Sequence, residues 1–261
     1  MLESVEYKGY TIKIENDHSP INPFEEWNGL PSLLVNYNNC FSEYGSIDID
    51  DILTLTREQI KNNFKAVQNV LCDHRPLLTI LRTETYLDRF DNAIEPLNEY
   101  LHEFYEGLTK KDKLAMLSDF LTIKDVPHLL TNSYGYSQGD YVEMLLIADD
   151  SYKNEHPTLS SLVDNYKERL QKELQDSAAL YSSWAWGDVY GFTVEDKEGD
   201  EIDSCWGFYG DNHEKSGLIE HAKNAIDCTI RYNRRVKLNK LKELIKNSVA
   251  IEKRGDILAT L

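Results

Sequence analysis

A β-hairpin is the element that most constrains how this chain folds, and it is predicted for residues 187–211. Two segments rich in β-branched and aromatic residues flank the polar loop DKEGD. Side chains alternate along a strand, so Tyr190, Phe192 and Val194 fall on one face of the first segment. The loop supplies the charge and the glycine that a short hairpin connection needs. The sequence therefore predicts an antiparallel pair of strands here.

The remaining periodicities predict an α+β fold. Three further segments read as strands, which gives five in all, at 5–15, 32–38, 140–148, 188–195 and 201–208. Apolar residues at spacings of three and four predict helices that begin after the N-cap Thr56 and that cover 84–108, 110–121, 159–178 and 216–247. Pro96 indicates either a kink or the first turn of a second helix. We expect a small, mostly antiparallel sheet with packed helices, a helical insertion and a long C-terminal helix.

Charge is distributed unevenly along the chain. The whole sequence has 45 acidic and 28 basic residues, a net charge of −17. Residues 212–261 hold 6 of the acids and 11 of the bases, so this segment is +5 and residues 1–211 are −22. A strongly negative body repels nucleic acid and attracts basic surfaces. We therefore expect no direct binding to nucleic acid and a partner with a basic groove.

Seven acids in the predicted helix 84–108 form what we call the acidic face. They step by three or four residues, opposite the apolar stripe, and are Glu84, Asp88, Asp91, Glu95, Glu99, Glu103 and Glu106. Carboxylates four residues apart are about 6 Å apart along a helix axis. Duplex DNA is also a row of closely spaced negative charges. The face would imitate a nucleic-acid backbone, or it is the solvated side of an amphipathic helix.

The C-terminal helix is basic and suggests self-association. Arg231, Arg234, Arg235 and Lys242 would pair with the acidic body of the same chain, or with a second copy in a homodimer. Contact with RNA or DNA is the alternative, which the net charge of the body disfavours.

Catalytic or metal-binding chemistry has little support in the sequence. The cysteines form no CxxC pair, the histidines show no HExxH spacing, and no cofactor motif is present. Asp196, Asp200 and Asp203 in the hairpin would be the ligands if a metal bound, although they lack the EF-hand spacing. Asp188 and Asp203 would face each other if a hydrolase used this hairpin. We expect a non-enzymatic protein without metal or cofactor, and keep the metal-dependent hydrolase as an alternative.

Three strings resemble a family of proteins from bacteriophages and mobile elements of Gram-positive bacteria. Ser19-Pro20 followed by EEWNGL is similar to an acidic loop of the family, although residues 21–24 depart from it. GYSQGD at 135–140 is intact, as are GDVYGF and DSCWGFYG within the hairpin. The resemblance covers roughly 5–40 and 131–212. It implies a family core at 1–50 and 131–212, a helical insertion at 51–130 and a basic helical extension at 213–261.

The resemblance also implies a role, because small acidic proteins of mobile elements often counteract host defences. We expect a phage-type protein that binds and inhibits a host defence protein or ribonucleoprotein, of the restriction or CRISPR-like kind. A non-catalytic interaction or oligomerisation module is a further alternative. The sequence shows no signal peptide pattern and no apolar run long enough for a membrane helix. The expected location is the cytoplasm of the bacterial host, without membrane attachment.

Overall fold

The computed structural model describes residues 3–37, 40–70, 91–135, 140–156 and 165–248, with the backbone alone at 70, 91–93 and 151. Its contacts divide the chain into two compact units. Met1–Pro20 and Gly187–Leu261 form what we call the terminal unit, and Ile21–Trp186 forms the central unit. The expected division into a family core, an insertion and an extension rests on the resemblance, which these contacts do not test. It stays a prediction.

A four-stranded antiparallel sheet is the basis of the terminal unit. Its strands, in spatial order, are β1 (Glu3–Tyr7), β2 (Tyr10–Asn16), β7 (Val189–Glu195) and β8 (Glu201–Tyr209). Lys8 and Gly9 join β1 to β2 with φ angles of 52° and 82°. Positive φ at both central residues is the geometry of the tight turn that matches strand twist. The segment expected as one bent strand is therefore a hairpin.

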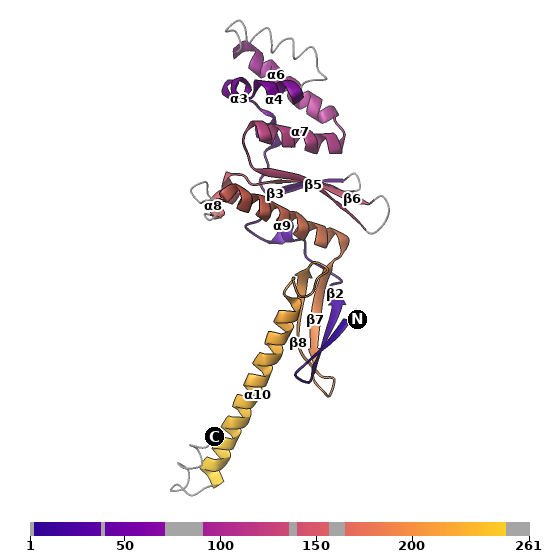
Figure 1. The fold of residues 1–261 in the computed structure, drawn as a ribbon, viewed down its shortest axis with the longest axis vertical. Coiled ribbons are helices and arrows are strands. Elements are labelled where there is room, and N and C mark those ends of the chain that lie inside the picture. The colour runs from indigo at the N-terminus through magenta and orange to yellow at the C-terminus, as the bar shows by residue number, and fades with distance from the viewer. Residues whose placement is uncertain (1–2, 38–39, 71–90, 136–139, 157–164, 249–261) are drawn as a thin grey trace. The chain divides into compact units, whose positions relative to one another are not determined.

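One long helix covers this sheet. Helix α10 (Leu218–Ser248) packs Leu218, Ala222 and Ile226 against the buried strand residues Ile12, Ile14, Phe192 and Val194. The second half of the helix runs past the end of the sheet (Figure 1) and is exposed at most positions. Packing against the sheet therefore stabilises only the first half of α10.

The central unit is built on a second four-stranded antiparallel sheet. Its strands, in spatial order, are β4 (Cys40–Tyr44), β3 (Ser32–Tyr37), β6 (Tyr141–Ile147) and β5 (His128–Tyr134). The middle strands β3 and β6 are buried on both faces. Helix α9 (Tyr166–Trp186) covers one face, and α7 (Lys110–Ile123) covers the other (Figure 1).

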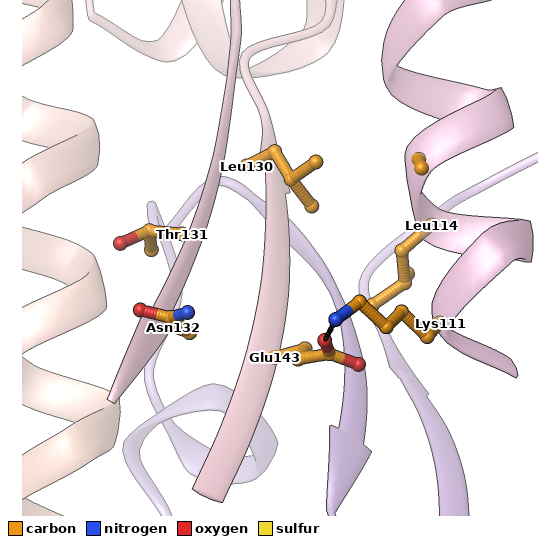
Figure 2. A pocket seen from close by; sticks show the side chains of 7 residues that line it. Lys111, Leu114, Leu130, Thr131, Asn132 and Glu143 are labelled. Atoms are coloured by element: carbon orange, nitrogen blue, oxygen red, sulfur yellow. Dashed lines mark ion pairs between the residues drawn. The ribbon is translucent and has the colours of Figure 1, made fainter. Parts of the chain in front are cut away.

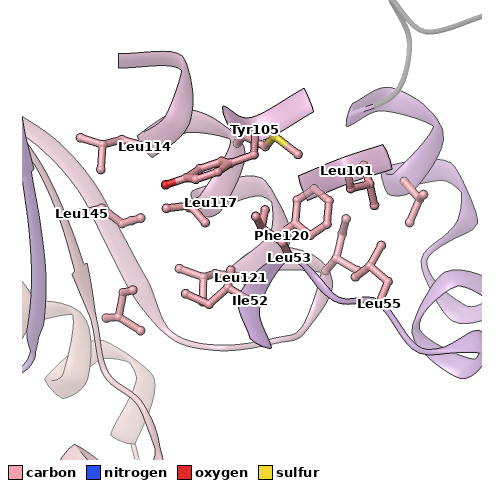
Figure 3. Packing of buried hydrophobic residues seen from close by; sticks show 14 of the residues in the cluster. Ile52, Leu53, Leu55, Leu101, Tyr105, Leu114, Leu117, Phe120, Leu121 and Leu145 are labelled. Atoms are coloured by element: carbon pink, nitrogen blue, oxygen red, sulfur yellow. The ribbon is translucent and has the colours of Figure 1, made fainter. Parts of the chain in front are cut away.

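A further helical layer lies over α7. It is formed by α6 (Asp91–Gly107) together with the short helices α2 (Ile49–Leu53), α3 (Arg57–Asn62) and α4 (Phe64–Val70). Figure 3 shows the contact, in which Leu101 and Tyr105 of α6 and Leu117 and Phe120 of α7 belong to one buried cluster. Two more short helices, α1 (Pro23–Glu26) and α8 (Asp150–Glu155), pack on the α9 side through Phe24 and Tyr152.

The α+β class, the antiparallel strands and the long C-terminal helix are confirmed. The five expected strands, however, are divided between two sheets, and β4 and β5 were not expected as strands. The capping box at Thr56 and Gln59 is present, although the helix it starts is interrupted at Asn63. Helix α6 runs through Pro96 without a break, because Leu97, Leu101 and Tyr105 continue the same buried stripe. Residues 84–90 lie outside the described residues.

Gly135 tests how tightly the central sheet and α9 pack. A methyl group at this position would lie 2.5 Å from the ring of Trp186. That ring is held, since its Nε1 donates to Ser133 Oγ at 2.7 Å and its edge packs on Tyr37. We predict that Gly135→Ala lowers the free energy of unfolding in urea by about 1–3 kcal/mol, as overpacking does.

The matched control is Gly107→Ala at the end of α6, where an added methyl group meets nothing within 4 Å. Alanine is the better helix former by about 1 kcal/mol, so this change should leave stability unchanged or raise it. Equal effects of the two substitutions would contradict the packing described for Trp186.

Candidate functional site

The acidic face projects from α6 into solvent. Glu95, Glu99, Glu103 and Glu106 are all exposed. The opposite side of the helix is buried in the helical layer through Leu97, Leu101 and Tyr105. Of the other predicted members, Glu84 and Asp88 lie outside the described residues, and only the backbone of Asp91 is described. The described part of the face is therefore a continuous row of carboxylates.

A shallow groove of about 730 Å³ runs along this row. Its lining residues come from α6 and from the segment after α2, and are Thr54, Ile94, Glu95, Asn98, Glu99, His102 and Glu103. Asn98 fixes the two walls together, because its Oδ1 accepts from Leu55 N at 3.1 Å and its Nδ2 donates to Leu55 O at 3.2 Å. His102 Nδ1 lies 3.2 Å from Asp50 Oδ1 on the same side. The carboxylates thus stand on a braced helix.

Within the described residues, one lysine forms an ion pair with the acidic face. Glu106 forms an ion pair with Lys113 of α7 at 2.9 Å. Among the residues that the structure describes, Glu95, Glu99 and Glu103 form no ion pair. Three neighbouring carboxylates are therefore exposed to solvent without a cationic partner in the described part of the chain.

The basic residues expected to mediate self-association are exposed on residues 231–248 of α10, which we call its second half. These are Arg231, Arg234, Arg235 and Lys242. The Arg231 guanidinium also donates to the backbone oxygen of Asp227 at 3.2 Å, within the same helix. Exposed apolar side chains accompany them, since Tyr232, Leu241 and Leu244 are 67%, 40% and 61% exposed. This half of α10 is thus both basic and apolar on its surface.

The hairpin acids are not assembled into a site. Asp196 Oδ1 accepts from the backbone N–H groups of Glu198 and Asp200 at 3.0 Å each, so it shapes the loop. Asp203 Oδ1 accepts from Ser204 N at 2.9 Å. Asp188 lies at the open end of the hairpin, bonded through its carbonyl to Gly210, whereas Asp203 pairs with Val194. Six residues of strand separate the two acids by about 20 Å, so the expected carboxylate pair is wrong.

Within the described residues, no group of three or more His, Cys, Asp or Glu side chains is arranged to hold a metal ion. None of the described helices combines the length and apolar character that crossing a bilayer requires.

Glycines of the motifs that resemble the mobile-element family, GYSQGD and GDVYGF, have structural roles. Gly135 opens the β5–β6 connection and lies under Trp186, while Gly191 lies under the ring of Trp206. A Cβ at Gly191 would be 2.1 Å from that ring. Glycine is therefore needed at both positions for close approach of an aromatic side chain. The described parts of these motifs therefore specify packing, while residues 136–139 of GYSQGD lie outside the described residues.

A second polar site escaped the sequence prediction. Glu143 of β6 is buried beside Asn36 of β3, under the start of α7, and faces Lys111 (Figure 2). The sequence feature that could have indicated this site is an asparagine and a glutamate inside the apolar strands SLLVNY and YVEMLLI. A single sequence does not tell whether such residues are buried.

Comparison of the chain with protein-family models, with curated proteins and with solved structures gives no match. The resemblance to the mobile-element family and the function drawn from it therefore stay predictions.

Tyr105, beneath the acidic face, should make stability depend on alkaline pH. Burial, with smaller contributions from Glu106 and Glu43, raises its pKa from 10.0 to about 12. Because the folded-state pKa lies above the unfolded value, the stabilisation is complete below pH 10.0 and is lost as the pH rises toward about 12. Thermal midpoints measured across this range should fall, and they should fall less steeply in Tyr105→Phe.

Tyr232→Phe is the control for this titration, because Tyr232 is 67% exposed on α10. It should leave the slope of the thermal midpoint against pH unchanged. If it flattened the slope as much as Tyr105→Phe, burial of Tyr105 would not be the cause.

Proposed function

We propose that this protein acts by binding, without catalysis, and that the acidic face of α6 contacts a basic surface of its target. The observation that supports this most directly is the row of Glu95, Glu99 and Glu103, exposed on a braced helix and without an ion pair among the described residues. A backbone that is already ordered before binding loses little conformational entropy on binding, which favours recognition by the braced helix.

The target we propose is a host defence complex that acts on nucleic acid, of the restriction or CRISPR-like kind, in the bacterial cytoplasm. Such complexes hold DNA or RNA in a positively charged groove. An acidic row would compete for that groove and so inhibit the complex. The role in counter-defence rests on the resemblance to mobile-element proteins, and the mechanism on the charge pattern.

Charge reversal of the row tests this mechanism. The triple variant Glu95→Lys, Glu99→Lys and Glu103→Lys should lose inhibition of DNA cleavage by at least about tenfold, since several charge-assisted contacts are removed. The assay uses purified restriction enzymes and CRISPR effector complexes, with wild-type protein titrated at several salt concentrations. Wild-type inhibition should weaken as salt rises.

The matched control reverses three exposed acids of α9, Glu168, Glu173 and Asp176, and so makes the same change in net charge. It should keep inhibition close to wild type. Equal losses in the two triple variants, or inhibition that salt does not change, would refute mimicry through α6.

A second function is favoured by the second half of α10, namely assembly with another copy of the chain. A groove of about 480 Å³ lies there, lined by Tyr10, Ile230, Asn233, Arg234, Lys237, Leu238 and Leu241. Apolar residues spaced three and four apart on an exposed helix form the seam of a helix pair. Acids elsewhere in the chain, which is −22 before residue 212, would attract the flanking bases of the second copy.

Sedimentation distinguishes this assembly from a monomer. The double variant Leu241→Asp and Leu244→Asp should shift a dimer toward monomer, because it places charges in the apolar seam. Asn239→Asp with Asn247→Asp makes the same charge change at exposed polar positions of the same helix and should stay dimeric. A wild-type protein that sediments as a monomer at high concentration would end this proposal.

A further inference from the structure

Three polar residues lie abreast across the central sheet. The register pairs Asn36 of β3 with Glu143 of β6, and Glu143 with Asn132 of β5. We call them the polar row. Side chains alternate along strands, so the row lies on the same face as Leu34 and Leu145, which pack toward α7. A buried carboxylate is costly unless it is fully paired, and Glu143 is only 8% exposed.

The bonding of Glu143 is incomplete. Its Oε2 accepts a hydrogen bond from Asn36 Nδ2 at 2.9 Å. Its Oε1 lies 3.7 Å from Lys111 Nζ, which is an ion-pair distance but too long for a hydrogen bond. The Lys111 side chain is itself 72% exposed. Among the described residues, therefore, Oε1 receives no hydrogen bond.

A cavity of about 410 Å³ opens beside this oxygen. Figure 2 shows Glu143, Asn132 and Leu130 on the strand side, with Leu114 of α7 across the space and Lys111 reaching over Glu143. The volume falls within the range of small-molecule pockets. One wall thus has an acceptor that needs a donor, while Leu114, Ala115 and Leu130 give the cavity an apolar part beside the polar Thr131 and Asn132.

We propose that this cavity binds a small organic cation, a primary ammonium or guanidinium group on a short apolar body. The cationic head donates to Glu143 Oε1, and the body packs on Leu114 and Leu130. The exposed Lys111 side chain swings into solvent to admit it, since it has no hydrogen bond to lose at Glu143. An anion would be repelled by the carboxylate, and a neutral molecule that displaced Lys111 would not replace its positive charge. This site is separate from the acidic face.

The probes are n-butylammonium and agmatine, with n-butanol and butyrate as neutral and anionic counterparts. Titration calorimetry on the full chain, with thermal shift as a second measurement, should give saturable binding of the two cations only. Glu143→Gln keeps the shape and removes the charge, and should weaken binding roughly tenfold to hundredfold, as loss of a charge-assisted hydrogen bond does. Lys111→Met should strengthen binding, because it removes the competing cation.

The matched control is Asp150→Asn, which removes an exposed carboxylate of α8 that also pairs with a lysine, Lys153, and that does not line this cavity. It should bind the cations as the wild type does. Binding of n-butanol equal to that of n-butylammonium, binding kept in Glu143→Gln, or binding weakened in Lys111→Met would each overturn the proposal. If Glu143→Gln does not fold, the binding measured for Lys111→Met and the comparison of n-butanol with n-butylammonium test the proposal instead.

Discussion

Burial of β3 and β6 on both faces is the constraint on which the central unit depends. Leu33 and Val35 point toward α9, and Leu34 points toward α7, so each face needs its own helical cover. Burying one such side chain contributes about 1.5–3 kcal/mol. Helix α7 in turn buries residues on its far side, which requires α6. Since the apolar stripe of α6 is buried in this contact, the carboxylates on the opposite side of the helix must face solvent. The position of the acidic face follows from the core.

In the terminal unit, too, the core uses only part of a helix, and the exposed part of that helix is basic. The sheet packs against only the first half of α10, and so most side chains of the remaining half, Ile245 excepted, are exposed. Residues 231–248 contain seven bases and one acid. Both candidate interaction surfaces are therefore faces of helices that the cores do not use. Substitutions at the exposed positions of these two surfaces should therefore leave the packing of the cores intact.

Local signals in the sequence identified local structure well. The loop DKEGD located the β7–β8 hairpin, and Thr56 with Gln59 located a helix start. Strand partners could not be predicted, because a strand's own residues do not say which other strand it pairs with. The pairing of strands divides the five expected strands between two sheets. For the same reason the polar row could not be predicted, since only the strand register brings Asn36 and Glu143 together. The predicted pairing of Asp188 with Asp203 was wrong because the register of the hairpin places the two residues far apart.

Helix α7 connects the two polar sites through its first turns. Lysines there are unfavourable for the helix itself, because the positive end of the helix dipole repels cations. The sequence nevertheless begins α7 with KKDK, and two of these lysines face acids on different elements. Lys113 contacts Glu106 at the end of the acidic face, and Lys111 contacts Glu143 in the sheet. Each ion pair offsets part of the dipole penalty. Because the two lysines meet their acids separately, a ligand that displaces Lys111 leaves the contact between Lys113 and Glu106 intact, and the two sites can act independently.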